Sequence, residues 1–535
     1  MRLTIPIILY AAAMLAAQPV TVTVLATTDL HGNLVPVDYV TGQPAARGLA
    51  KLATLIREAR AGNANTLVID CGDTIQGTPL ESVYQSILRS GADPAGHRPA
   101  APLAGDPMMR AMNLLGYDAM TLGNHEFNAG LANLAAARRD AKFPWVSSNT
   151  IVAPGGGESE FAGYVVKTVG GVKVAVIGVT TPLITMWERA ENLGAYRFAP
   201  PIEAVRALAA KLKRVERPDL IVVAAHSGLG RNLETGASEE PVENVVYGLA
   251  EEAPEVDAIV FGHSHLQLEG RLVGNVLLVQ PRNGGASLAR LDFTLERRPA
   301  GGWTVASKKS RLIPVTAQTL AAPDLMAMAA PYEAAAERYL NTPVATSSRP
   351  LSAARGREED TAVVDLVQRV QLSYARADVS FTALFDPQVR VPQGQVTVRQ
   401  IAALYPYDNE LLAIEGTGKM VKDALENAAR FFSGSGVPGF NYDMASGVEY
   451  EIDRSRPEGD RIRRLQWRGR PLAPERNLRI AINSYRAGGS GGYTMFRGAK
   501  VLWRSGEDIR ELVIRYYTEH KTIPVEAVGN WKIVK

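Results

Sequence analysis

Apolar runs alternate with amphipathic stretches from Val20 to about Pro314. The runs are rich in β-branched residues and short enough for strands; they are 20–25, 66–69, 174–179, 220–225, 258–261 and 276–279. Between them, segments such as 49–61, 131–139 and 202–215 carry Ala and Leu at helical spacing, with Arg and Lys interspersed. Buried strands that alternate with helices are typical of layered α/β folds, so this region predicts such a domain.

The pattern changes around residues 321–340, where Ala, Met, Leu and Glu predict a single helix. Asn341-Thr342-Pro343 follows and is a signal that ends helices. From about residue 345 a new pattern begins, with a helix near 361–375 and strands near 411–415, 447–452 and 478–483. We therefore expect a first domain at 18–318, a linker helix at 319–344 and an α+β domain at 345–535.

Length and composition support this division. The 535 residues exceed what one hydrophobic core usually supports, and 46% apolar with 21% charged residues is typical of globular proteins. The net charge of +3 is too small to favour a polyanionic partner, so we expect no nucleic-acid polymer to bind. We expect a monomer. The single cysteine, Cys71, cannot form an internal disulfide and is interpreted as a small buried residue.

The first 17 residues resemble a secretory leader. Arg2 precedes an apolar stretch at 5–17 that ends in small residues, which predicts a signal peptide cut near Ala16 or Ala17. A membrane-spanning helix would need about 20 apolar residues, more than this stretch supplies. The alternative is a short buried helix. We expect a periplasmic or secreted protein without a membrane anchor.

Histidine and acidic residues gather where the apolar runs end. Five of the seven histidines occur in Asp29-Leu30-His31, Gly123-Asn124-His125-Glu126, His226 and Gly262-His263-Ser264-His265, and Asp73 follows Gly72 after another run. Ligands and catalytic groups collect at the carboxyl ends of strands in α/β sheets. These residues therefore predict one site at that edge.

Their spacing and chemistry favour metal ions. Residues two apart on an extended chain point the same way, so Asp29 with His31, and His263 with His265, are each predicted to present two ligands to one side. Mixed Asp, Asn and His ligands suit Zn²⁺, Mn²⁺, Fe²⁺ or Co²⁺, and the lack of cysteine ligands argues against a structural zinc site. The set exceeds the needs of one ion, which favours two divalent ions about 3.5–4 Å apart.

Each residue also has an ordinary structural interpretation. Taken singly, His226 is more often a core histidine than a ligand, and Asp73 could be a turn residue or helix cap. His263 and His265 alone are as consistent with a loop as with a metal site. All of these interpretations would have to hold at once, which is why we favour the metal site.

The motifs, in this order, resemble those of the calcineurin-like metallophosphoesterases, and in particular the bacterial 5′-nucleotidase and 2′,3′-cyclic-nucleotide phosphodiesterase group. The resemblance implies a four-layer α/β catalytic domain, with helices flanking two β-sheets, and a C-terminal α+β 5′-nucleotidase-type domain. It implies that Asp29, His31, Asp73 and His265 hold one metal, that Asp73 bridges, and that Asn124, His226 and His263 complete the second. His125 would be the catalytic histidine, stabilising charge or protonating the leaving oxygen while a water activated by the metals attacks phosphorus.

One position departs from the 5′-nucleotidase pattern. Many of those enzymes have Asp three residues after the motif histidine, whereas this chain has Asn128, which lacks the negative charge. The sequences 123–128, 27–31 and 405–409 are more similar to the 2′,3′-cyclic-nucleotide 2′-phosphodiesterase/3′-nucleotidase branch. The alternatives are a 5′-nucleotidase or nucleotide-sugar hydrolase and, in another class, a non-catalytic nucleotide-binding scavenging protein. The full ligand set argues against the last.

The resemblance also indicates base-binding residues in the second domain. Tyr442 and Tyr493 match positions where the family stacks aromatic rings on the base, with Asn409 as a further substrate contact. Tyr485 is the alternative to Tyr493, because the glycine-rich loop at 488–492 leaves the alignment open. Any of these tyrosines could instead be a packing residue.

Overall fold

The computed structural model describes residues 18–153, 159–233, 236–238, 243–299, 301–407, 409–434 and 436–534. The predicted signal peptide at 1–17 lies outside these residues. The chain divides into two compact units. The first holds the residues up to Val37 with Pro44–Gln85 and Ala101–Tyr332, and the second holds Asp38–Gln43, Ser86–Ala100 and the residues from Glu333 onward. The division falls within α9 (Pro323–Leu340), which occupies the segment where the composition predicts a helix.

The first unit contains two sheets of six strands each. In the first sheet, four parallel strands continue into an antiparallel pair, in the order β16 (Trp303–Pro314), β15 (Ser287–Arg297), β1 (Val20–Thr27), β4 (Thr66–Asp70), β5 (Ala119–Thr121), β6 (Trp145–Val146). In the second sheet, four parallel strands lie between antiparallel edge strands, in the order β13 (Leu268–Val273), β14 (Val276–Gln280), β12 (Ala258–Phe261), β11 (Leu220–His226), β9 (Val172–Thr180), β8 (Tyr164–Val169).

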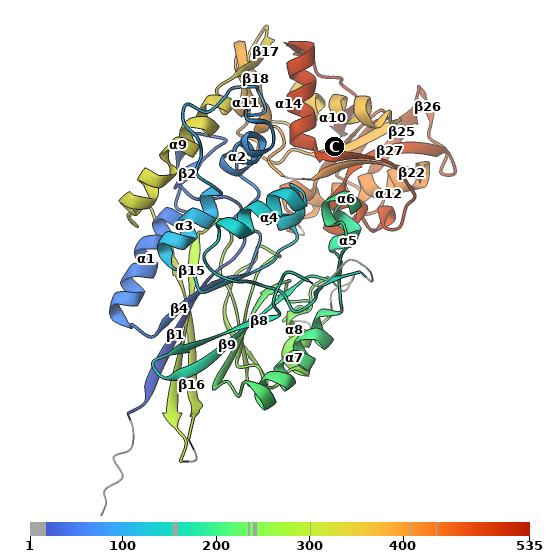
Figure 1. The fold of residues 1–535 in the computed structure, drawn as a ribbon. Coiled ribbons are helices and arrows are strands. Elements are labelled where there is room, and N and C mark those ends of the chain that lie inside the picture. Colours follow the sequence, from blue (N-terminus) through green and yellow to red (C-terminus); the bar gives the residue numbers. More distant parts are fainter. Residues whose placement is uncertain are drawn as a thin grey trace, which may run out of the picture. The chain divides into compact units, whose positions relative to one another are not determined.

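The two sheets pack face to face around an apolar core. Val22 and Val24 of β1 belong to the same buried cluster as Val174 and Val176 of β9. A second cluster lies between the other face of the second sheet and the helices α7 (Pro201–Val215) and α8 (Val246–Glu252). The first sheet is contacted by α1 (Leu49–Gly62), which adjoins α3 (Pro107–Leu115) and, through it, α4 (Leu131–Asp140) (Figure 1). The predicted four-layer arrangement is confirmed.

The second unit is an α+β domain. Its largest sheet has five strands in the order β23 (Asp443–Ser446), β19 (Val379–Ala383), β27 (Asn477–Asn483), β22 (Glu410–Thr417), β28 (Val501–Asp508). Helix α10 (Ala362–Ala375) packs on this sheet and against α14 (Ile509–His520), while α12 (Gly418–Ala429) contacts β22 and β23. A smaller sheet has the order β26 (Arg470–Pro471), β25 (Ile462–Trp467), β24 (Glu449–Asp453), β30 (Trp531–Val534). A three-stranded sheet pairs β21 (Gly394–Thr397), β17 (Pro343–Ser347) and β29 (Thr522–Ile523).

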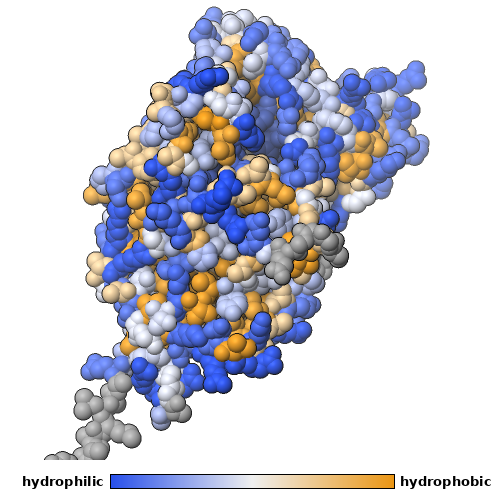
Figure 2. Space-filling view, in the orientation of Figure 1, coloured by the Kyte–Doolittle hydropathy of each residue, from blue (hydrophilic) through white to orange (hydrophobic). Residues whose placement is uncertain are grey.

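The surface is mixed in polarity. Figure 2 shows hydrophilic residues over most of one face, with hydrophobic residues exposed in separate small groups. Within the described part of the chain, none of the helices combines the length and the hydropathy that crossing a bilayer requires.

Candidate metal centre

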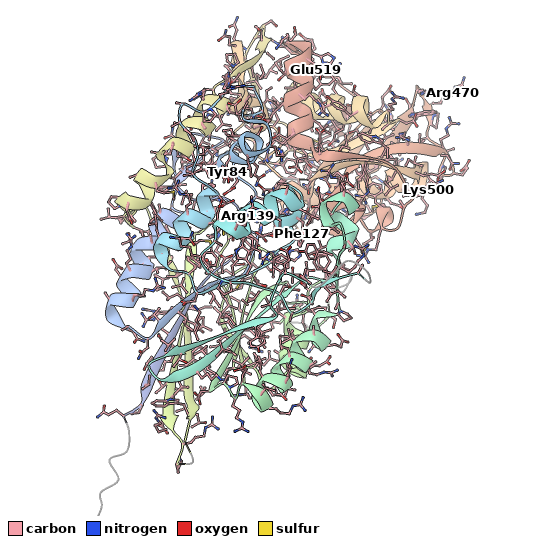
Figure 3. All side chains as sticks on the ribbon, in the orientation of Figure 1. Tyr84, Phe127, Arg139, Arg470, Lys500 and Glu519 are labelled. Atoms are coloured by element: carbon pink, nitrogen blue, oxygen red, sulfur yellow. The ribbon has the colours of Figure 1, made fainter. Side chains whose placement is uncertain are left out.

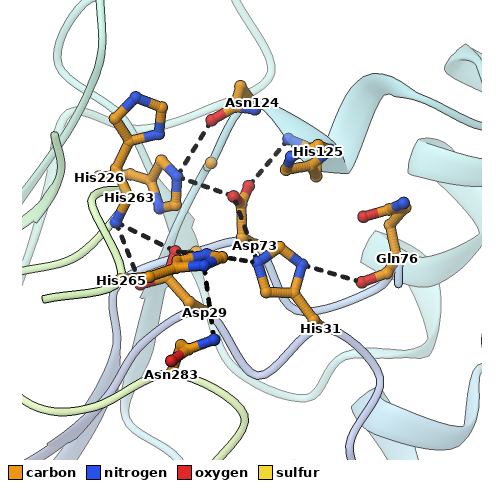
Figure 4. A network of polar contacts seen from close by, with 12 residues as sticks. Asp29, His31, Asp73, Gln76, Asn124, His125, His226, His263, His265 and Asn283 are labelled. Carbon is orange, nitrogen blue, oxygen red and sulfur yellow. Dashed lines mark hydrogen bonds and ion pairs between the residues drawn. The ribbon is translucent and has the colours of Figure 1, made fainter. Parts of the chain in front are cut away.

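The histidines and acids singled out by the sequence meet at the carboxyl ends of parallel strands. Asp29 and His31 follow β1, Asp73 follows β4, and Asn124 and His125 follow β5. From the second sheet, His226 is the last residue of β11, and His263 and His265 follow β12. Figure 4 shows these side chains converging from both sheets. The structure therefore brings together every residue predicted to bind metal.

The first of two clusters consists of Asp29, His31 and His265, whose ligand atoms lie within 4.8 Å of one another. The Nε2 atoms of His31 and His265 are 3.0 Å apart, and His265 Nε2 is 3.5 Å from Asp29 Oδ1. Two ring nitrogens that face each other with a carboxylate oxygen beside them form a donor set suited to a borderline divalent cation.

The second cluster consists of Asp73, His226 and His263, again within 4.8 Å of one another. His226 Nε2 lies 3.0 Å from Asp73 Oδ2 and 3.2 Å from Asn124 Oδ1, which adds the amide oxygen to this group. Asp73 Oδ2 is also 3.9 Å from His31 Nε2 in the first cluster. One carboxylate oxygen therefore stands between both clusters, as a bridging ligand would.

Hydrogen bonds orient the histidines for coordination. The Nδ1 of His226 donates to the carbonyl of Cys71 at 2.8 Å, and the Nδ1 of His31 donates to the carbonyl of Gln76 at 3.2 Å. Both rings are thereby turned so that Nε2 faces the cluster as a lone-pair donor when the ring is neutral. Outer partners of this kind are usual around metal-binding histidines, and the residues present therefore fit two divalent ions.

The pKa values indicate a site that favours positive charge. Burial would raise the pKa of Asp29, but the hydrogen bond from His265 and nearby histidine charges lower it to about 2. Burial would likewise raise the pKa of Asp73, and His226 and His125 hold it well below its usual value. Burial would lower the pKa of His226, but Asp73 raises it to about 10. The two buried carboxylates thus stay ionised, and their negative charge favours a proton on His226. A bound divalent cation would supply that positive charge in place of the proton.

The backbone around these ligands differs from the sequence-based expectation. Asp29, His31, Asp73, His263 and His265 all have positive φ, between 46° and 72°. Such left-handed conformations cost non-glycine residues about 1–3 kcal/mol each and concentrate at functional sites. The extended geometry predicted for the Asp-x-His and His-x-His pairs is therefore wrong. Asp29 and His31 nevertheless lie in one cluster. His265 belongs to the first cluster and His263 to the second, which is the division that the resemblance implies.

The loops approach so closely that two positions accept only glycine. A Cβ on Gly123 would lie 2.1 Å from Asp73 Oδ1, and a Cβ on Gly262 would lie 1.8 Å from Thr28 Oγ1 and 2.4 Å from Asp29 Oδ2. These two glycines are explained by close packing of neighbouring loops, against the backbone and carboxylate of Asp73 at Gly123 and against the side chains of Thr28 and Asp29 at Gly262.

His125 lies beside the clusters and belongs to neither. Its backbone N–H donates to Asp73 Oδ1 at 2.8 Å, and its ring centre is 5.4 Å from that of His31. It begins the short 3₁₀ helix η1 (His125–Phe127), whose Phe127, labelled in Figure 3, is fully buried. The Phe127 ring packs edge-on against Tyr196 and Phe198 of β10 (Tyr196–Phe198). This packing fixes the helix that carries the histidine.

Three acidic residues support the site and were not predicted from the sequence. The Glu126 carboxylate accepts N–H groups from Gly123, Asp73 and Thr74 at 2.6–2.9 Å, which joins two ligand-bearing loops. Glu243 Oε1 lies 2.5 Å from His263 Nε2, so Nδ1 is the nitrogen of that ring that would coordinate. Glu188 Oε2 accepts a hydrogen bond from Asn128 at 2.5 Å. Glu126 stands within a motif, but no local pattern marks Glu188 or Glu243.

In the second unit, the structure argues against base stacking on two of the predicted tyrosines. Tyr442 is 1% exposed and stacks on Phe431, with ring centres 5.1 Å apart and planes 8° apart. Tyr493 is fully buried, stacks on Phe496, and has the Arg486 guanidinium 4.3 Å from its ring centre. These rings are core residues, and neither has a face to offer a base.

Tyr485, the alternative, is 44% exposed, and Phe440 is 42% exposed. Both are positioned by Arg486, which forms a bidentate pair with Asp443 at 2.8 Å and donates to the Phe440 carbonyl at 2.7 Å. The Arg486 guanidinium lies 5.2 Å from the Tyr485 ring centre. Asn409, also predicted to contact substrate, is partly buried and donates to the Tyr405 hydroxyl at 3.4 Å.

Comparison with known proteins agrees with this geometry. Residues 22–267 match the model of the calcineurin-like phosphoesterases, and residues 341–498 match that of the 5′-nucleotidase C-terminal domain. The chain belongs to the calcineurin-like phosphoesterase family. The two matched ranges of this phosphoesterase cover its metal clusters and its exposed aromatic residues, respectively.

Relatives of the phosphoesterase carry nucleotide-related names. A 2′,3′-cyclic-nucleotide 2′-phosphodiesterase/3′-nucleotidase of Haemophilus influenzae is 28% identical over 96% of this chain and 87% of its own length. The trifunctional nucleotide phosphoesterase YfkN of Bacillus subtilis is 28% identical over 97% of this chain, which spans 39% of that longer protein. The structure of a putative 5′-nucleotidase of Staphylococcus aureus, in complex with α-ketoglutarate, aligns with a TM-score of 0.78 and 26% identity, covering 96% of this chain and all of that one.

Proposed function

We propose that this phosphoesterase hydrolyses nucleotides, acting as a 2′,3′-cyclic-nucleotide 2′-phosphodiesterase with 3′-nucleotidase activity. The observation that carries the chemistry is Asp73, whose Oδ2 stands between two histidine-carboxylate clusters while its Oδ1 accepts the backbone N–H of His125. The names of several relatives, and Asn128 in place of Asp, support the cyclic-nucleotide branch.

Asp29, His31, Asp73 and His265 would hold one divalent ion, and Asp73, Asn124, His226 and His263 a second. Two such ions, when bound, would polarise a phosphoryl group and lower the pKa of a coordinated water molecule. His31 and His226 would each offer Nε2 to an ion as a neutral ring, because backbone carbonyls hold their Nδ1–H groups. Glu243 gives His263 the reverse orientation. The ions are proposed to be Zn²⁺, Mn²⁺, Fe²⁺ or Co²⁺.

His125 would handle the leaving group. Its Nδ1 faces Asn128 Oδ1 at 2.5 Å, which directs Nε2 away from that partner. A protonated Nε2 beside the phosphate stabilises charge that develops on the leaving oxygen or transfers its proton to it.

The test is phosphate release by the purified protein, loaded with Mn²⁺ or Co²⁺, before and after chelation. The substrates are 2′,3′-cyclic AMP, 3′-AMP and 5′-AMP, with added phosphomonoesterase to reveal ring-opened product. We expect chelation to abolish turnover, metal to restore it, and the cyclic and 3′ substrates to be preferred. Preference for 5′-AMP would select the second candidate, a 5′-nucleotidase, which the likeness to the S. aureus structure favours. No turnover with any metal would overturn the proposal.

We further propose that Tyr485 and Phe440 bind the base. Both rings are exposed, and the buried Arg486–Asp443 pair fixes the segments that carry them. Stacking on one aromatic ring stabilises a bound base by about 1–3 kcal/mol.

Replacing Tyr485 with alanine is expected to raise KM for 3′-AMP about tenfold, because one stacking contact is lost. Hydrolysis of β-glycerophosphate, which has no base, should be unchanged and serves as the control. Equal KM values for wild type and variant with 3′-AMP would exclude Tyr485 from the base site.

Two proposals concern the chain as a whole. The protein is proposed to be periplasmic or secreted, because residues 1–17 have the pattern of a signal peptide. It is proposed to act as a monomer.

A further inference from the structure

Asn128 connects His125 to a carboxylate that the sequence does not reveal. The Oδ1 of Asn128 lies 2.5 Å from His125 Nδ1, and its Nδ2 lies 2.5 Å from Glu188 Oε2. Glu188 caps the C-terminus of α5 (Ile184–Trp187), 60 residues along the chain from Asn128. The three side chains form a continuous line of hydrogen bonds.

The direction of each hydrogen bond follows from the chemistry of its groups. An ionised carboxylate only accepts, so the Asn128 amide must turn its NH₂ group toward Glu188. The amide oxygen then faces His125 and also only accepts, so the His125 Nδ1 must carry a proton. Glu188 thereby fixes the tautomer of the neutral ring in which the proton is on Nδ1. Nε2 is the nitrogen proposed to act on the leaving group.

Glu188 is itself held in place. Its Oε1 accepts the backbone N–H of Arg189 and the side-chain N–H of Asn192, both at 2.8 Å, which leaves Oε2 for Asn128. Asn192, in α6 (Ala190–Leu193), also donates to the Asn128 backbone carbonyl at 3.0 Å. The Asn192 side chain thus links Glu188 to the Asn128 backbone. The position of Glu188 beside Asn128 therefore does not depend on the Asn128–Glu188 hydrogen bond alone.

We propose that Glu188 is a positioning residue for His125, acting through the Asn128 amide in place of a carboxylate bonded directly to the histidine. This rests on the proposed function, since His125 is the proposed catalytic histidine. The proposal also changes the interpretation of Asn128. The negative charge that an Asp at this position would place beside His125 is supplied by Glu188, on the far side of the Asn128 amide.

The first test measures the tautomer, which does not depend on turnover. The zinc-loaded, ¹⁵N-histidine-labelled protein is studied by NMR at about pH 8.5, where ordinary imidazoles are neutral. The His125 signals are those that a His125→Gln variant lacks. We expect the Nδ1–H form in the wild type and a mixture of both tautomers in Glu188→Ala, because the released amide can present either its oxygen or its NH₂ group.

The second test exchanges the amide and the carboxylate. Asn128→Asp alone places two carboxylates in contact, whereas Asn128→Asp with Glu188→Gln restores one charge and the same number of hydrogen bonds. We expect Glu188→Ala to lower kcat about 10- to 100-fold with little change in KM, since a hydrogen bond to a charged group is lost. Asn128→Asp should also lose activity, and the double variant should recover to within about threefold of wild type, because the coupled pair is complete again.

Glu191→Gln is the matched control. It removes the same charge from the adjacent helix, where Glu191 is 69% exposed and pairs with Arg189, without touching Asn128. We expect it to keep the wild-type tautomer and kcat. The proposal is overturned if Glu188→Ala keeps both, or if the double variant is no more active than Asn128→Asp. A wild type that binds zinc and shows the Nδ1–H form but releases no phosphate would overturn the proposed function alone.

Discussion

Replacement of Asp73 by asparagine is expected to lower phosphate release at least about a thousandfold, the equivalent of about 4 kcal/mol of transition-state stabilisation. The reason is that Asp73 Oδ2 lies close to both clusters, 3.0 Å from His226 Nε2 and 3.9 Å from His31 Nε2. The amide keeps the shape of the side chain but removes the charge that would hold both cations.

Metal content measured by mass spectrometry should fall from two ions per chain to one or none. The control is Glu58→Gln on α1, which removes one exposed carboxylate of the same unit and should change neither metal content nor rate. Circular dichroism should show that both variants are folded. If Asp73→Asn retained two ions and a rate near that of wild type, Asp73 would not be the bridging ligand.

Replacement of His125 by asparagine is expected to lower kcat by about 10²- to 10⁴-fold, the usual contribution of a general acid or base. In contrast to Asp73→Asn, both metal ions should remain, because the His125 side chain belongs to neither cluster. The same mass spectrometry and phosphate assays therefore separate the two roles.

A leaving group that needs no proton provides a further comparison. The loss of kcat should be smaller for p-nitrophenyl phosphate esters than for nucleotides, because p-nitrophenolate leaves without assistance. A His125→Asn protein that had lost its metal, or that retained full activity on 3′-AMP, would contradict the assigned role.

The sequence predicts the layers and the convergence of the ligands because both depend on where apolar runs end. Asp29, Asp73, Asn124, His226 and His263 each stand at or just after such an end, and parallel strands bring their carboxyl ends together. The left-handed turns could not be predicted from the run lengths, because positive φ is uncommon outside glycine. For that reason the extended geometry predicted for the Asp-x-His and His-x-His pairs was wrong, whereas the assignment of His265 and His263 to different ions, which the resemblance implied, agrees with the two clusters.

The remaining parts of the site depend on distant segments. Glu188 and Glu243 reach Asn128 and His263 from loops with no motif, so only the fold reveals them. In the second unit, the spacing of tyrosines in the sequence says nothing about which ring faces inward. Phe431 and Phe496 cover Tyr442 and Tyr493, while Tyr485 remains at the surface.

The close approach at Gly123 and Gly262 bears on any attempt to transplant this site. Copying the seven ligand side chains onto another α/β scaffold would fail wherever the recipient loops carry a methyl group at these two positions. A Cβ there would collide with the carboxylates of Asp73 and Asp29, which are themselves ligands. A transplanted site would therefore have to include the closely packed loops together with their ligands. A designer would have to reproduce the glycine positions in those loops before adding the ligand side chains.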